Sequence, residues 1–173
     1  MINLRHTLTT AHEVLKKNTI SHALIGGFAL ATYGVHRSTS DIDFLADGTK
    51  KELIKEVLLK AGFLLKFESN EVLQFTGPGF LDVLLANRPI SQEMLTKAGH
   101  DSNLDIHILR AEDLIGLKIQ AYKNDPSREL QDKADIQNLL KLQHLDIKII
   151  KKYADLFDEW SAIEKIQKTA NDT

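Results

Sequence analysis

The chain has 173 residues, a formal net charge of −2 at pH 7 and no cysteine. That length suits one compact domain with its own hydrophobic core, together with a helical extension. The near balance of charge argues against a protein that coats nucleic acid without regard to sequence. The lack of cysteine excludes disulfides, thiolate catalysis and cysteine-based metal sites, so any metal must be held by oxygen or imidazole ligands.

No segment has the pattern of a membrane span or of a secretion signal. Residues 1–18 combine helical spacing of apolar side chains with polar residues between them. No run anywhere in the chain approaches the roughly 20 apolar residues that a membrane span requires. We therefore expect a cytoplasmic protein that does not enter a membrane.

The first part of the chain is predicted to alternate between helices and strands. Apolar spacing of three or four residues predicts a helix, whereas alternation and short apolar runs predict strands. Glycine marks the expected ends of helices. The predicted elements are a helix over 1–18, a strand over 23–25 ending at Gly26-Gly27, a short helix over 28–33 terminated by Gly34, a polar loop over 35–40, a strand over 41–45 and a helix over 50–61 closed by Gly62.

The second part is predicted to add strands and then to become helical. These predicted elements are strands over 63–67, 72–75, 81–85 and 104–109, followed by helices over 113–122, 127–142 and 146–166. We therefore predict an α+β fold in which helices flank a mixed sheet. The expected division is a core over 1–110 and a helical C-terminal part, packed on that core, over 111–173.

Two carboxylates on the predicted strand over 41–45 are candidate metal ligands. Successive side chains of a strand point to opposite faces, so Asp41 and Asp43 share one side while Ile42 and Phe44 point into the core. Such a pair repels by roughly 3 kcal/mol at an effective dielectric near 20, which protonation or a cation must offset. Oxygen ligands favour Mg²⁺ or Mn²⁺, which complete their shells with phosphate oxygens, so a nucleotide is the expected substrate.

Gly26-Gly27 lies at the predicted junction of a strand and a helix. Missing Cβ atoms let backbone N–H groups approach a ligand there, and the start of a helix favours an anion, so we expect phosphate at this point. Taken alone, a glycine pair is also typical of a simple turn, and Asp41-Ile42-Asp43 is typical of solvated acids. The interpretation depends on both features occurring in this order.

The two motifs together resemble a known family. The stretch from Ile25-Gly26-Gly27 to Asp41-Ile42-Asp43 is similar to the polymerase-β-like nucleotidyltransferase superfamily, and most similar to its bacterial branch of minimal nucleotidyltransferases and AbiE/MenT-type toxins. The resemblance covers 23–140 and implies a nucleotidyltransferase fold. It further implies that the glycine pair contacts the triphosphate, that the strand carboxylates bind metal and that a third carboxylate lies on a neighbouring strand. Asp82 matches that position, with a satisfied structural acid as the alternative.

Other positions match this branch less closely. The segment 112–118 resembles a helix whose lysine reaches phosphate, so Lys118 is either a phosphate ligand or a surface lysine. Asp132 and Asp135 match the Asp-x-x-Asp pair that this branch tends to show on the next helix, with a solvated helix face as the alternative, and Gln131 replaces the lysine expected there. Arg37 and Ser40, just before the metal-binding strand, are further expected nucleotide ligands.

The resemblance implies an enzyme that moves a nucleoside monophosphate from a nucleoside triphosphate to an acceptor hydroxyl. The acceptor is expected to be an RNA end or a protein, and the enzyme a toxin with an antitoxin partner; an antibiotic-modifying enzyme is an alternative. Gln131 motivates another alternative, a degenerate domain that binds nucleotide or a partner without catalysis. An apolar stripe over 149–166 motivates a third, an interaction module. The nucleotide base and the oligomeric state stay open.

Overall fold

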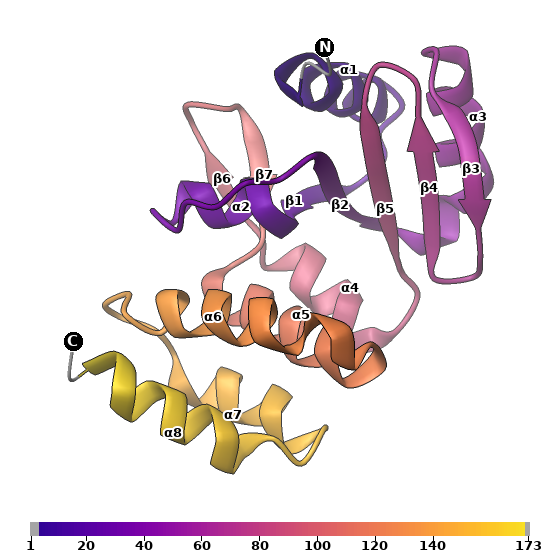
Figure 1. Ribbon diagram of the computed structural model, residues 1–173. Helices are drawn as coiled ribbons and strands as arrows, with labels where there is room; N and C mark the ends of the chain where they lie inside the picture. Colours follow the sequence, from indigo (N-terminus) through magenta and orange to yellow (C-terminus); the bar gives the residue numbers. More distant parts are fainter. Residues whose placement is uncertain (1–3, 172–173) are drawn as a thin grey trace. The chain divides into compact units, whose positions relative to one another are not determined.

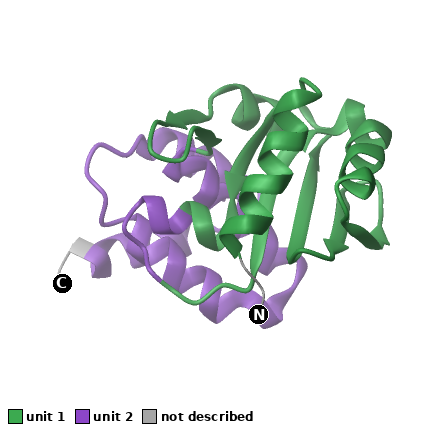
Figure 2. Ribbon diagram, turned by 90° about the horizontal axis from the view of Figure 1, so that it is seen from above, with its two compact units in different colours: residues 1–29, 37–109 green, residues 30–36, 110–173 purple. Residues whose placement is uncertain are grey.

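The computed structural model describes residues 4–171 and divides into two compact units (Figures 1 and 2). Unit 1 comprises Met1–Ala29 and Arg37–Leu109, and unit 2 comprises Leu30–His36 and Arg110–Thr173. Helix α2 (Gly26–Thr32) therefore contributes its first turn to unit 1 and its remainder to unit 2. The first three residues of the expected N-terminal helix lie outside the described part of the chain.

Unit 1 is built on a seven-stranded mixed sheet with the order β3-β4-β5-β2-β1-β7-β6. Its strands are β1 (His22–Ile25), β2 (Asp41–Asp47), β3 (Leu64–Glu68), β4 (Val72–Thr76), β5 (Phe80–Ala86), β6 (Gly99–Asp101) and β7 (Ile106–Ile108). Strand β2 pairs in parallel with β5 and antiparallel with β1. Strand β1 in turn pairs in parallel with β7, which makes the sheet mixed as the sequence predicted.

One face of this sheet carries the hydrophobic core of unit 1. On β2, Ile42 and Phe44 are fully buried, whereas Asp41 and Asp43, which alternate with them, are only half-buried. This is the alternation expected of a strand with one face in the core. Helices α1 (Leu4–Lys17) and α3 (Lys51–Lys60) cover the core face and contact each other. Their apolar side chains at helical spacing are buried there.

Two elements of unit 1 were absent from the sequence prediction. Helix α4 (Pro89–Thr96) begins with proline at its first position, but it has only eight residues and buries only Met94, so its apolar spacing is too short to predict a helix. Strand β6 has three residues, none of them buried, and it pairs with β7 through backbone hydrogen bonds. Strand β7 also starts later than expected, at Ile106, because Asp105 before it adopts a left-handed conformation.

In the described residues, unit 2 is helical. Its helices after α2 are α5 (Ala111–Asn124), α6 (Glu129–Leu139), α7 (Ile147–Asp155) and α8 (Trp160–Asn171), and a short 3-10 helix η2 (Pro126–Arg128) links α5 to α6. Helix α5 contacts α6 and α7, and α8 contacts both of these in turn. The corresponding 3-10 helix of unit 1 is η1 (Gly48–Lys50). No helix of the described chain is long and apolar enough to cross a membrane.

The prediction of a single helix over 146–166 is wrong, because the structure has two helices there, α7 and α8. Asp158 adopts a left-handed conformation with φ 56°, and the backbone N–H of Glu159 donates to the carbonyl of Ala154, which ends α7. Apolar spacing continues through this break, so periodicity alone cannot reveal it. Ile150, Tyr153 and Ile163 of the predicted stripe are buried, as expected of a stripe that faces a core.

Candidate active site

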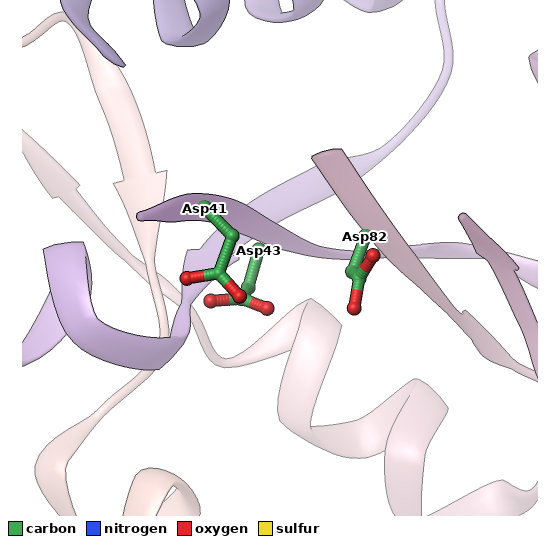
Figure 3. A group of neighbouring side chains, drawn as sticks. All are labelled: Asp41, Asp43 and Asp82. Atoms are coloured by element: carbon green, nitrogen blue, oxygen red, sulfur yellow. The ribbon is translucent and has the colours of Figure 1, made fainter. Parts of the chain in front are cut away.

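Three aspartates from two paired strands meet on the half-buried face of the sheet. Asp43 of β2 lies directly opposite Asp82 of β5 in the parallel register, and Asp41 precedes Asp43 by two residues on the same side. Each offers a carboxylate oxygen that lies within 4.8 Å of those of the other two. Figure 3 shows their carboxylates turned to the same side of the strands. The fold thus brings together the three acids that the sequence singled out, and we call them the acidic triad.

Two neighbouring side chains orient the acidic triad through hydrogen bonds. Thr39 Oγ1 donates to Asp41 Oδ1 at 2.7 Å, from the loop that enters β2. Gln74 Nε2 donates to Asp82 Oδ2 at 2.9 Å, from the strand position directly opposite Asp82. A hydrogen bond to a ligating carboxylate fixes the orientation of that carboxylate. Thr39 and Gln74 are therefore positioned to orient Asp41 and Asp82 as metal ligands.

Thr39 and Gln74 are the residues that the sequence analysis missed. Thr39 lies in the predicted polar loop over 35–40, a loop that could also touch phosphate, but its bond to Asp41 is not predicted, although a hydroxyl two residues before a carboxylate is a frequent local hydrogen-bond partner. Gln74 stands alone as a polar residue between Leu73 and Phe75, and this alternation could have placed it on the polar face of its strand. Only the pairing of β4 with β5 brings it to Asp82.

The glycine pair lies directly against the acidic triad. Gly26 has φ +65°, and a Cβ there would overlap the carboxylate of Asp43. A Cβ on Gly27 would lie 2.8 Å from Thr39 Oγ1, also too close. The sequence predicted that the short helix begins at residue 28, after the glycine pair. In the structure the pair itself forms the start of α2. The missing side chains therefore permit the backbone at the start of α2 to approach Asp43 and Thr39.

The remaining candidates of unit 1 lie in the loop before β2. Ser40 immediately precedes Asp41, and Arg37 stands three residues earlier. The guanidinium of Arg37 donates from Nη1 to the carbonyl of Ser38 at 3.0 Å. Both residues are thus adjacent in sequence to the acidic triad, and their role as nucleotide ligands stays a prediction.

Three candidates gather in unit 2, where they form a buried ion cluster. Lys118 Nζ lies 2.9 Å from Asp132 Oδ1 and 2.6 Å from Asp135 Oδ2. Lys118 is 7% exposed, and the two aspartates are 1% and 2% exposed. The alternatives of a surface lysine and a solvated helix face are therefore wrong. Their role as nucleotide ligands stays a prediction, but the structure gives them partners within unit 2.

Two more side chains complete this cluster, which we call the lysine–aspartate cluster. Arg128 Nε lies 3.2 Å from Asp132 Oδ2, and Gln131 Nε2 donates to Asp135 Oδ1 at 3.1 Å. Gln131, which replaces an expected lysine, thus contributes a neutral donor to one of the two acids. With Lys118 and Arg128 as cations, the formal charges of the cluster balance.

The donor set of the acidic triad fits a hard divalent cation. All three ligands are carboxylate oxygens, which suits Mg²⁺ or Mn²⁺ better than a metal that prefers sulfur or imidazole. Their close approach also favours a bound cation, since like charges at this distance repel. Among the described residues, no other group of three or more acidic or imidazole side chains gathers its ligand atoms so closely. The acidic triad could therefore hold a metal.

Comparison with known proteins gives the fold a name. No model of a protein family matches the chain, and no curated protein matches its sequence. The antibiotic-resistance factor ANT(2'')-Ia is similar in structure, with a TM-score of 0.58 at 14% identity, over 97% of this chain and 91% of that one. A nucleotidyltransferase-like protein from Paracoccidioides brasiliensis matches with a TM-score of 0.55 at 17% identity, over 95% of this chain and 92% of that one.

A third solved structure agrees with these two. The lincosamide antibiotic adenylyltransferase LnuA matches with a TM-score of 0.52 at 14% identity, over 76% of this chain and 93% of that one. Identities this low establish the architecture and leave the chemistry to the residues of the site. The expected fold class is confirmed: the chain has the nucleotidyltransferase fold, with an acidic triad on β2 and β5 that could hold a divalent metal.

Proposed function

We propose that the chain is a nucleotidyltransferase, which moves a nucleoside monophosphate from a nucleoside triphosphate to an acceptor hydroxyl. The observation that carries this proposal is the meeting of Asp41, Asp43 and Asp82 on paired strands of a nucleotidyltransferase fold. Phosphoryl-type transfer depends chiefly on positioning and charge stabilisation, so a few carboxylates and phosphate contacts suffice. This is the activity that the sequence resemblance implied.

The acidic triad would hold one or two Mg²⁺ ions. When bound, Mg²⁺ supplies neutralisation of the charge on the triphosphate and activation of the acceptor oxygen. The chain's own residues orient the ligands: Thr39 fixes Asp41, and Gln74 fixes Asp82. In the transfer, the acceptor oxygen bonds to the α-phosphorus, the bond to pyrophosphate breaks, and we assign Asp82 as the group that takes the hydroxyl proton.

The donor nucleotide is assigned to the side of the acidic triad next to the glycine pair. Gly26 and Gly27 leave room for close approach to the backbone beside Asp43 and Thr39. Arg37 and Ser40 in the adjoining loop are the proposed phosphate ligands of unit 1. Lys118, Asp132 and Asp135 are kept as predicted nucleotide contacts, although their mutual ion pairs favour a structural role.

The acceptor is proposed to be the end of an RNA, and the enzyme a toxin held in check by an antitoxin. The named structural neighbours support a second candidate, because ANT(2'')-Ia has been solved with adenylyl-2''-tobramycin and LnuA with lincomycin. A small antibiotic is thus a reasonable second acceptor to test. The degenerate alternative predicts nucleotide binding without transfer to any acceptor.

The decisive experiment compares Asp43→Asn with the wild type in transfer from each of four α-labelled nucleoside triphosphates. Bulk RNA, a protein extract, tobramycin and lincomycin serve as acceptors, with Mg²⁺ or Mn²⁺ present. Because the substitution removes a ligating charge and keeps the side-chain volume, we expect transfer to fall by about 10²- to 10³-fold. The labelled acceptor identifies the acceptor class in the same assay.

The matched control is Asp47→Asn, since Asp47 lies on the same strand and its side chain caps η1 outside the acidic triad. This variant should keep wild-type transfer. Equal transfer by Asp43→Asn and the wild type would exclude the proposed mechanism. Nucleotide binding without any labelled acceptor would instead favour the degenerate alternative.

A further inference from the structure

The face of the sheet that carries the acidic triad is left open over strands β3 and β4 and over residues 80–84 of β5. On these strands the core face buries Leu73, Phe75, Leu81 and Val83 almost completely. On the other face Ala86, at the end of β5, is buried, whereas the side chains of β3 and β4 and of β5 up to Leu84 are half-buried or exposed. The open face consists of Leu64, Phe67, Val72, Gln74, Thr76, Phe80 and Leu84, next to Asp82.

This open face is apolar and aromatic although it meets solvent. Phe67 is 52% exposed, Phe80 47% and Leu64 59%. The polar groups between them, Gln74 and Thr76, are uncharged and half-buried, and the charged neighbours are Asp82 of the acidic triad and the exposed Lys66 in the bulge of β3. Large apolar side chains gathered on one exposed surface usually mark a binding site.

The strand register makes the open face continuous with the acidic triad. Phe67 lies opposite Gln74, Gln74 opposite Asp82, and Asp82 opposite Asp43, so the four form one row across the sheet. Phe80 lies opposite Asp41 and precedes Asp82 by two residues, about 7 Å along the strand. The spacing of neighbouring strands places Phe67 about 10 Å from Asp82. Both rings thus lie within reach of a molecule whose reactive group is at Asp82.

A β-bulge explains how Phe67 reaches this face. The register of β3 against β4 shifts between Leu65, which lies opposite the buried Phe75, and Phe67, which lies opposite Gln74. Regular alternation would have put Phe67 on the same face as Leu65. The extra residue reverses the alternation and turns the ring toward the row of the acidic triad, and bulges next to active sites are known to re-aim side chains in this way.

The chemistry of the face selects among acceptors. A polycationic acceptor would find no acidic side chain on the open face outside the acidic triad. A flat strand surface with exposed aromatic rings is suited to unpaired nucleobases, which stack on such rings. Gln74, after its bond to Asp82, still has a second amide hydrogen and a carbonyl oxygen with which to contact a base edge.

We propose that the open face binds the terminal, unpaired nucleobases of a single-stranded RNA, which stack on Phe80 and Phe67 and place the 3′-terminal hydroxyl at Asp82. The role of the 3′-terminal hydroxyl as the acceptor of the transferred nucleotide rests on the proposed function. This assignment makes Phe67 and Phe80 the residues that determine acceptor specificity. The binding itself requires no catalysis and can be measured apart from transfer.

The test is a fluorescence titration of a short single-stranded RNA whose 3′-terminal nucleotide is 2-aminopurine, with Mg²⁺ and without nucleoside triphosphate. Stacking on an aromatic ring should quench the fluorophore. We expect Phe80→Ala and Phe67→Ala each to weaken binding by about 5- to 100-fold, the range that stacking of one base supports. Phe80→Trp should restore binding, and Phe80→Leu should not, which separates stacking from mere apolar contact.

The matched control is Leu59→Ala, because Leu59 is similarly exposed, at 43%, but lies on α3, which covers the opposite face. RNA binding that none of the phenylalanine substitutions weakens, or no RNA binding at all, would overturn the assignment. So would phenylalanine-dependent labelling of a protein or an antibiotic in place of RNA. Phenylalanine-dependent binding without nucleotide transfer would leave the RNA surface standing and refute the enzyme activity instead.

Discussion

Each unit of the molecule contains a compact group of aspartates, and the two groups are built in opposite ways. In unit 1, the carboxylates of Asp41, Asp43 and Asp82 face one another within 4.8 Å and stay half-buried. In unit 2, Asp132 and Asp135 are almost fully buried and are bridged by the ammonium group of Lys118. The first group gathers like charges, and the second alternates opposite charges.

From this difference we predict that the group in unit 1 binds a ligand and that the group in unit 2 stabilises the fold. Gathered carboxylates with access to solvent favour an incoming cation, because the cation relieves their repulsion. The charges of buried carboxylates that a lysine already bridges are largely compensated within the protein, so these carboxylates need no added cation. Two acids of each group stand close together in the sequence, as Asp-x-Asp in unit 1 and as Asp-x-x-Asp in unit 2. The spacing of the acids alone therefore does not distinguish the two predicted roles.

The largest expected effect comes from removing the cation of the lysine–aspartate cluster. Lys118→Met leaves two buried carboxylates next to each other, and breaking a buried ion pair in this way costs about 3–5 kcal/mol. Urea unfolding followed by the fluorescence of Trp160, which is the single tryptophan of the chain and lies on α8 of unit 2, measures the loss.

Lys123→Met is the control for this change, because Lys123 pairs with Glu159 and is 40% exposed at its side chain. Such a partly exposed pair should contribute far less to stability than the buried cluster. If Lys118→Met proves no more costly than the control and instead abolishes nucleotide binding, Lys118 is a phosphate ligand and the contrast between the two groups fails.

The second expected effect is a loss of stability at acidic pH, caused by the buried histidine pair His12 and His22 of unit 1. His22 donates from Nδ1 to the carbonyl of Ile20 at 2.7 Å, and its Nε2 lies 2.8 Å from His12 Nδ1. Burial lowers the pKa of His22 from 6.5 to about 4. The folded chain therefore keeps this ring neutral between pH 6.5 and 4, whereas the unfolded chain takes up a proton. Stability is highest above pH 6.5 and falls by about 3 kcal/mol on acidification through that window.

Urea unfolding followed by circular dichroism at pH 7, 5.5 and 4.5 measures this fall. His22→Gln should flatten the dependence, since the substituted side chain takes up no proton. His100→Gln, at a half-exposed histidine on β6, should keep the wild-type slope. An unchanged slope in His22→Gln would mean that another group causes the acid sensitivity.

The smallest expected effect concerns the support of the acidic triad. Gln74→Leu removes the hydrogen bond to Asp82 and keeps the side chain at a similar size. Loss of such a supporting bond typically weakens metal binding by about 10- to 100-fold. Titration with Mn²⁺ alone, followed by electron paramagnetic resonance, measures the affinity without requiring an acceptor or a nucleotide.

Gln92→Leu, at an exposed glutamine of α4, is the matched control and should bind Mn²⁺ as the wild type does. If Gln74→Leu binds Mn²⁺ equally well, the orientation of Asp82 does not depend on this bond. Absence of Mn²⁺ binding by the wild type would count against the acidic triad as a metal site altogether.

The local features of the site could be predicted from the sequence because each depends on neighbours in the chain. Alternation along β2 puts Asp41 and Asp43 on one side, and the apolar run of β1 leads into Gly26-Gly27 at the start of a helix. These patterns repeat every two or four residues and need no knowledge of the rest of the fold. Asp82 could be proposed as well, but only through the family resemblance.

The tertiary structure alone decided which distant residues meet. Gln74 reaches Asp82, and Phe67 joins their row, only through the register of β3, β4 and β5 and the bulge in β3. Lys118 reaches Asp132 and Asp135 only through the packing of α5 on α6. Such contacts depend on pairing and packing between separate elements, which the spacing of residues within one element does not encode. The sequence therefore determined the carboxylates of the acidic triad's first strand, and the tertiary structure determined their partners and the surface beside them.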